Sequence, residues 1–145
     1  MATRVVLADD HALLREEVKR LLARAGIDVV GEAENGVELI QMADELRPNI
    51  VVTDISMPLI NGLEAAAEIL RDLRIPSIVM TIHTDPGYVL RALGCGSAGY
   101  ILKSRVGTCL VEAIREVCAG KMYVSSGISG DLHLSGRAFR AHSCL

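Results

Sequence analysis

The stretch 50–70, IVVTDISMPLINGLEAAAEIL, holds one complete unit of the fold that this chain is predicted to adopt. It opens with a β-branched apolar run that ends in Asp54, as a buried strand does. After a loop, Asn61 and Gly62 precede an amphipathic stretch with apolar side chains at helical spacing. These apolar side chains are Leu63, Ala66, Ala67 and Leu70. The stretch therefore predicts a strand, a loop and a helix, with a carboxylate where the strand ends.

The same order of strand and helix recurs along the whole chain. Short apolar runs predict buried strands at residues 5–9, 29–33, 50–54, 77–81 and 100–103. Amphipathic stretches separate them, and a last helix is expected at about 106–119, ended by Gly120. The expected helix caps are Asn35, Asp85 and Ser104. Five alternating units predict an α/β fold, a doubly wound parallel sheet with five helices on its two faces.

A glycine pattern at residues 94–99, GCGSAG, fits the G-x-G-x-x-G motif of dinucleotide-binding folds. That motif works only where the glycines follow a strand and open a helix, so that helix N–H groups face the pyrophosphate. Here the glycines come after a predicted helix and before a predicted strand. We therefore interpret them as a helix stop and a tight connection, and not as a nucleotide site.

Composition narrows the class of protein further. The chain has 145 residues, a net charge of -3 and no Trp, and no basic stripe with interleaved aromatics is present, which disfavours direct binding to nucleic acid. Its apolar runs are far shorter than the roughly 20 residues of a membrane span, and the N-terminal residues do not resemble a secretory signal. Its cysteines form no C-x-x-C pair of the kind that binds zinc. These features predict a cytoplasmic protein that does not contact a membrane.

Polar side chains gather where the predicted strands end. Asp9 and Asp10 end the first strand, Asp54 the third, Thr81 the fourth and Lys103 the fifth. In an open parallel sheet these ends share one edge, where ligands bind. Three close carboxylates repel one another unless a cation lies between them, and oxygen ligands favour Mg²⁺. A metal, an ammonium and a hydroxyl suit phosphoryl binding, with Asp54 as a nucleophile able to form a covalent intermediate.

With these residues in place, the sequence resembles the receiver domain of bacterial two-component response regulators, of the NarL/FixJ (LuxR-type) subfamily. The resemblance covers roughly residues 3–122. It rests on LADDHALLR at 7–15, TDISMPLINGLEA at 53–65, MTIHTDPGYVLRAL at 80–93 and GSAGYILKS at 96–104. It implies the flavodoxin-like (CheY-like) fold with a five-stranded sheet of order 2-1-3-4-5.

The resemblance also implies roles for single residues. Asp54 would accept a phosphoryl group from a sensor histidine kinase, and Lys103 would pair with that group. Thr81 would be the switch hydroxyl and Tyr100 the aromatic ring that turns inward behind it. The implied protein ligands of Mg²⁺ are Asp10, Asp54 and the backbone carbonyl of Ser56, with Asp9 acting through a metal-bound water.

Further positions follow from the same resemblance. Ser56 and His83 would modulate the lifetime of the phosphoryl group, although His83 is equally compatible with an ordinary loop histidine. His11 is expected to be structural, because Mg²⁺ prefers oxygen ligands. Ser104 departs from the proline that many receivers carry after the lysine.

The resemblance implies a signalling switch and not an enzyme, beyond catalysis of its own phosphorylation and dephosphorylation. The expected domain is 1–122, with 123–145 a linker or flexible tail and no helix-turn-helix output domain in this chain. Control of transcription and contact with DNA would therefore require an output domain outside it. A homodimer on phosphorylation is compatible with the family.

Two other classes of protein share part of this pattern. A haloacid-dehalogenase-type phosphatase also uses an Asp nucleophile and Mg²⁺, but needs a second Asp two residues later, where Ser56 stands. A flavodoxin-like FMN carrier needs a Ser/Thr/Gly phosphate loop after its first strand. Asp9 and Asp10 in that place would repel the phosphate.

Overall fold

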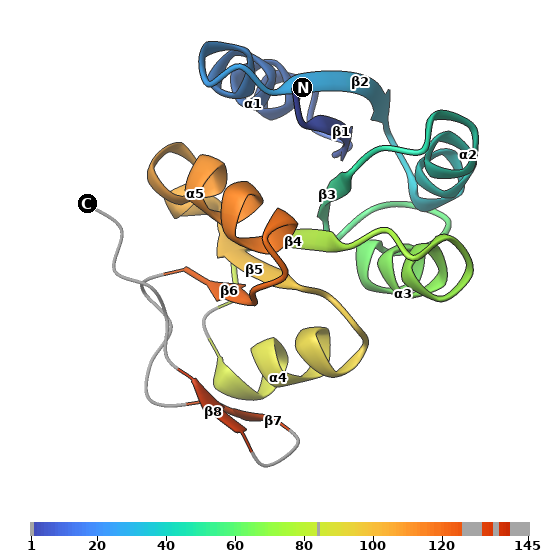
Figure 1. Ribbon diagram of the computed structural model, residues 1–145. Helices are drawn as coiled ribbons and strands as arrows, with labels where there is room; N and C mark the ends of the chain where they lie inside the picture. Colours follow the sequence, from blue (N-terminus) through green and yellow to red (C-terminus); the bar gives the residue numbers. More distant parts are fainter. Residues whose placement is uncertain (1, 84, 126–131, 135–136, 140–145) are drawn as a thin grey trace.

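The computed structural model describes residues 2–83, 85–125, 132–134 and 137–139. Its main sheet is parallel and has the strand order β2-β1-β3-β4-β5-β6 (Figure 1). The strands of this sheet are β1 (Arg4–Ala8), β2 (Asp28–Ala33), β3 (Ile50–Asp54), β4 (Ser77–Thr81), β5 (Gly99–Leu102) and β6 (Tyr123–Val124). The predicted doubly wound fold and the order of its first five strands are confirmed.

Helices cover both faces of the sheet (Figure 1). The helices are α1 (Ala12–Arg24), α2 (Gly36–Leu46), α3 (Gly62–Leu73), α4 (Pro86–Gly94) and α5 (Val106–Cys118). On one face, α1 and α5 pack on Val5 and Leu7 of β1, while α2 and α3 pack on Val6 and Ala8 from the other side. This alternation along one strand is what a sheet buried on both faces requires. Helix α4 covers the β4–β5 end through Val89.

Most helices begin at the capping residues that the sequence predicts. Asn35 and Asn61 accept hydrogen bonds from the backbone N–H groups of Glu38 and Glu64, and Asp85 caps α4 in the same way. The predicted cap at Ser104 is wrong. Ser104 lies within a 3-10 turn (Lys103–Arg105), and α5 begins after Arg105 without a side-chain cap.

The glycines of the 94–99 motif have the structural role that was predicted for them. Helix α4 ends at Gly94, and β5 begins at Gly99. Between them Gly96 has a φ of 103°, which residues other than glycine rarely adopt. The motif therefore connects a helix to a strand.

The sheet extends beyond the five predicted strands. Tyr123 and Val124 form β6, parallel to β5, where a linker was expected to begin. The Ser125 N–H donates to the Tyr100 carbonyl at 2.9 Å, and the Leu102 N–H donates to the Ser125 hydroxyl at 3.0 Å. The folded unit thus continues at least to Ser125.

Two further strands follow, and the rest of the predicted tail lies outside the described residues. Strands β7 (Leu132–Leu134) and β8 (Arg137–Phe139) pair in antiparallel fashion, and β7 lies beside α4 (Figure 1). Across the ranges that the structure describes, none of the helices has the length and apolar character needed to cross a bilayer.

Candidate functional site

The carboxyl ends of four neighbouring strands bring the predicted polar residues together. Asp9 and Asp10 follow β1, while Asp54 and Thr81 are the last residues of β3 and β4. Lys103 comes directly after β5. Because parallel strands point the same way, residues far apart in sequence meet at this edge.

Asp54 is the buried centre of the site. Only 2% of its surface is exposed, and its Oδ2 lies 2.7 Å from the Lys103 Nζ. Its Oδ1 accepts a hydrogen bond of 3.2 Å from the Ser56 N–H. Close packing behind Asp54 requires glycine at position 62, since a Cβ there would collide with the Asp54 backbone carbonyl oxygen. The carboxylate is therefore fixed in position and paired with one ammonium.

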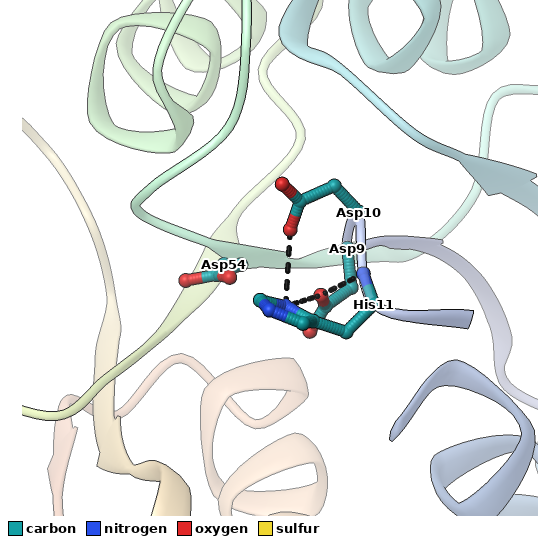
Figure 2. A group of neighbouring side chains, drawn as sticks. All are labelled: Asp9, Asp10, His11 and Asp54. Carbon is teal, nitrogen blue, oxygen red and sulfur yellow. Dashed lines mark hydrogen bonds and ion pairs between the residues drawn. The ribbon is translucent and has the colours of Figure 1, made fainter. Parts of the chain in front are cut away.

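Asp9, Asp10, His11 and Asp54 form an acidic cluster with one histidine (Figure 2). One potential ligand atom from each lies within 4.8 Å of the others. Asp9 is fully buried, and its Oδ2 has no hydrogen-bond partner among the described residues. Such an oxygen is costly unless a cation or water satisfies it.

Charge and donor type in the acidic cluster fit a divalent metal ion. Three carboxylates and the ammonium of Lys103 leave two negative charges when His11 is neutral, which one Mg²⁺ would balance. Carboxylate oxygens are the ligands that Mg²⁺ prefers. The residues present therefore fit the predicted metal.

Arg15 holds the turn that carries Asp9 and Asp10. Its guanidinium donates to the Asp9 backbone carbonyl at 2.6 Å and to the Glu32 carboxylate at 3.3 Å. Its side chain is 13% exposed, so both bonds are partly shielded from water. The guanidinium thus ties the β1–α1 turn to strand β2.

Thr81 and Tyr100 lie on the other side of Asp54. The Thr81 Oγ1 accepts a hydrogen bond of 3.1 Å from the His83 N–H, and the Tyr100 hydroxyl donates to the His83 carbonyl at 3.0 Å. Tyr100 is fully buried, and burial raises its pKa to about 12, opposed by a hydrogen bond with Thr81. The hydroxyl therefore stays protonated, and a donor, at neutral pH.

The loop after β4 is joined to α4 by aromatic contacts. The rings of His83 and Tyr88 stack with centroids 4.3 Å apart and planes inclined by 20°. The Arg91 guanidinium lies 5.7 Å from the centre of the Tyr88 ring, within cation–π range. A shift of the His83 loop would therefore displace Tyr88 and change the position of α4.

A cavity of about 330 Å³ opens over the carboxylate. Its lining residues are His11, Asp54, Ser56, Thr81, Ile82, His83 and Lys103. It joins the acidic cluster to the Thr81 side, and is large enough for a phosphoryl group beside a hydrated ion.

All the predicted strand-end residues are thus brought together, with Ser56 and His83 lining the same cavity. Two further contributors, His11 and Arg15, were not assigned to the site. Their signal lay in the spacing: His11 follows the acidic pair, and Arg15 stands four residues later, one helical turn away. The direction of the His11 ring depends on the backbone of the turn, which the sequence does not specify.

Comparison with known proteins gives consistent matches. The family model described as "Response regulator receiver domain" matches residues 5–115. Response regulator GacA of Pseudomonas viridiflava is 39% identical over 135 residues, 90% of this chain and 62% of that protein. Nitrate/nitrite response regulator protein NarL of Escherichia coli (strain K12) is 37% identical over 140 residues, 94% of this chain and 64% of that protein.

A solved structure gives the same result. The two-component response regulator of the LuxR family from Aurantimonas sp. SI85-9A1 superposes with a TM-score of 0.81 at 34% identity. The match covers 88% of this chain and 91% of that one. The chain spans less than two thirds of the length of the GacA and NarL relatives.

Proposed function

The chain belongs to the receiver domains of two-component response regulators, and from this premise we propose that Asp54 accepts a phosphoryl group from a phosphohistidine of a sensor histidine kinase. The modified domain then changes conformation to control transcription through an output domain. The observation that supports this most is the buried Asp54 carboxylate, 2.7 Å from Lys103 at a cavity of about 330 Å³.

The transfer itself needs only a nucleophile and neutralised charge. A carboxylate oxygen of Asp54 attacks the phosphorus, and the phosphorus–nitrogen bond of the donor breaks. Its electron pair goes to the imidazole nitrogen, and because the other ring nitrogen of the phosphohistidine is already protonated, the donor departs as neutral histidine. Lys103 neutralises charge on the phosphoryl oxygens. The chain acts as a switch that catalyses its own phosphorylation and dephosphorylation.

Mg²⁺ is the proposed cofactor. Asp10, Asp54 and the Ser56 backbone carbonyl would hold it, with Asp9 acting through a bound water. When bound, the ion neutralises charge on the transferred group. The unpartnered Asp9 Oδ2 supports this assignment.

Thr81 and Tyr100 are the proposed switch. Shifting a two-state equilibrium from 1:99 to 99:1 requires about 5.5 kcal/mol of differential binding. One charge-assisted hydrogen bond supplies roughly 1.5–3 kcal/mol, so both Lys103 and Thr81 are needed. Movement of the Thr81 hydroxyl to the phosphoryl group would release the His83 N–H, and Tyr100 would transmit this change through the His83 carbonyl.

The remaining assignments concern the lifetime of the phosphoryl group, the binding partners of the chain and its location in the cell. Ser56 and His83, which line the cavity, would set the access of hydrolytic water to the phosphoryl group. The working partners would be the kinase, a second copy of the chain on phosphorylation, and DNA through an output domain. The cytoplasm is the proposed location, and the residues after Ser125 would lead from the receiver toward that output domain.

Intact mass spectrometry after incubation with acetyl phosphate and Mg²⁺ tests the proposal. The parent chain should gain one phosphoryl group, and Asp54→Asn should gain none. Asp44→Asn, on an exposed residue of α2 that pairs with Arg47, is the matched control and should behave as the parent. A gain that survives Asp54→Asn would show that another residue is the acceptor.

A further inference from the structure

The His11 side chain points into the acidic cluster instead of capping the helix that follows it. His11 is the N-cap residue of α1, yet its side chain makes no capping hydrogen bond. Its Nδ1 lies 3.1 Å from the Asp9 Oδ1 and 3.1 Å from the Asp10 Oδ1 (Figure 2). The ring therefore lies toward two carboxylates and does not cap the helix.

These distances are those of hydrogen-bonded pairs, and they are also those of neighbouring ligands around one ion. Mg²⁺–oxygen and Zn²⁺–nitrogen bonds are about 2.0–2.1 Å long, so adjacent ligands of an octahedral ion lie about 3 Å apart. The Nδ1 has the same spacing to one oxygen of Asp9 and one of Asp10. Small movements toward a common centre would let all three atoms bind one cation.

The buried Asp9 carboxylate points independently to a bound cation. Its Oδ1 already accepts a hydrogen bond of 2.8 Å from the His11 N–H, while its Oδ2 is buried without a partner among the described residues. An imidazole carries at most one proton on Nδ1, so the ring cannot fully satisfy both Asp9 and Asp10. A cation bound beside the ring would satisfy both carboxylates.

We propose that the Nδ1 of His11 is a metal ligand, which makes the site a mixed nitrogen–oxygen site for a borderline transition-metal dication such as Ni²⁺ or Zn²⁺. The inference rests on the proposed function, because Asp10 and Asp54 serve both kinds of ion. Imidazole suits Zn²⁺ and Ni²⁺, whereas Mg²⁺ binds oxygen. His11 therefore strengthens the binding of transition metals and contributes little to the binding of Mg²⁺.

Calorimetric titration of the full chain with NiCl₂ and, separately, with MgCl₂ tests this. The parent and all variants carry His133→Gln and His142→Gln, so that neither of these two C-terminal histidines can bind Ni²⁺. Loss of an outer-shell partner costs roughly 10- to 100-fold in metal affinity, and loss of a direct ligand should cost at least about tenfold. His11→Ala should therefore weaken Ni²⁺ binding by at least that factor and leave Mg²⁺ binding within about threefold.

Asp44→Asn is the control, since Asp44 is an exposed carboxylate of α2 that pairs with Arg47 and lies outside the acidic cluster. It should leave the affinity for both ions as in the parent. Nitrogen NMR of the unmutated His11 ring gives a second measurement, in which Zn²⁺ moves the Nδ1 resonance and Mg²⁺ does not.

The outcomes separate the two proposals. Unchanged Ni²⁺ affinity in His11→Ala, together with normal Mg²⁺ binding, would overturn the role of His11 and leave the Mg²⁺ site intact. Mg²⁺ binding that is also unaffected by Asp54→Asn would overturn both, because the acidic cluster would then not be the metal site.

Discussion

The two sides of Asp54 are built differently. On the β1–β3 side, Asp9 and Asp10 lie on a turn that Arg15 holds. Arg15 donates to the Asp9 backbone carbonyl at 2.6 Å and forms an ion pair with Glu32 of β2. On the β4–β5 side, Thr81 and Tyr100 are joined to one another mainly through single hydrogen bonds to the backbone of His83.

Under the proposed function, this difference would separate binding from signalling. Fixed carboxylates would give the cation and the phosphoryl group a site that needs little rearrangement. Single hydrogen bonds on the other side can be exchanged for bonds to the phosphoryl group at small cost. We therefore expect changes on the β1–β3 side to alter affinity, and changes on the β4–β5 side to alter the response.

Lys103 bridges the two sides, and its removal should have the largest effect on stability. In metal-free protein, Lys103→Met leaves the buried Asp54 carboxylate without its cation and should lower the free energy of unfolding by about 2–3 kcal/mol. Urea denaturation measures this, and added Mg²⁺ should recover part of the loss. Lys121→Met breaks an exposed pair with Glu116 and should cost under about 1 kcal/mol. Equal losses in the two variants would mean that the Lys103–Asp54 pair is no stronger than a surface ion pair.

Tyr100 should make the β4–β5 side sensitive to alkali. Its folded pKa of about 12 lies above the usual value of 10.0, so folding favours the protonated form. The stabilisation is fully present below pH 10 and is lost as the pH rises toward 12, because only the unfolded chain releases this proton in that window. The loss should be on the order of 2 kcal/mol. Denaturation of Tyr100→Phe across this range should show a shallower decline, and an identical decline would contradict the assignment.

Arg15 should set the metal affinity of the β1–β3 side. Arg15→Ala frees the turn that carries Asp9 and Asp10, and should weaken Mg²⁺ binding roughly tenfold, as loss of an outer-shell partner does. Calorimetry measures the affinity, and Arg15→Lys should restore only part of it, because lysine lacks the guanidinium fork. Arg20→Ala, on the exposed face of α1, is the control. A loss of affinity as large in Arg20→Ala would point to a general charge effect.

The sequence predicts much of this architecture because two simple patterns dominate it. Apolar runs ending in Asp9, Asp54 and Thr81 mark the strands, and parallel strands bring these ends together. The fold class was therefore predictable from these patterns, while the family and the strand order followed from the resemblance of the motifs to receiver domains. The cap at Asn35 was also found, since a cap depends on residues next to one another in the chain.

Features that depend on distant contacts were not predicted. Strand β6 is two residues long, too short to show any periodicity, and forms because β5 offers a free edge. Ser104 has the right chemistry for a cap, but the 3-10 turn moves the start of α5 beyond it. The direction of the His11 ring depends on the backbone of the β1–α1 turn, which Arg15 ties to Glu32 of β2. Each of these results from tertiary structure overriding a local preference.

Amide NMR of Thr81→Ala with beryllofluoride and Mg²⁺ tests the division between the two sides most directly. Beryllofluoride mimics the phosphoryl group on Asp54, and Thr81 is neither the nucleophile nor a proposed metal ligand. We expect the resonances of Asp10 and Ser56 to shift as in the parent, while those of Tyr100 and α4 stay close to their resting positions. The same shifts on Tyr100 and α4 as in the parent chain would contradict it, because the response would then not pass through Thr81.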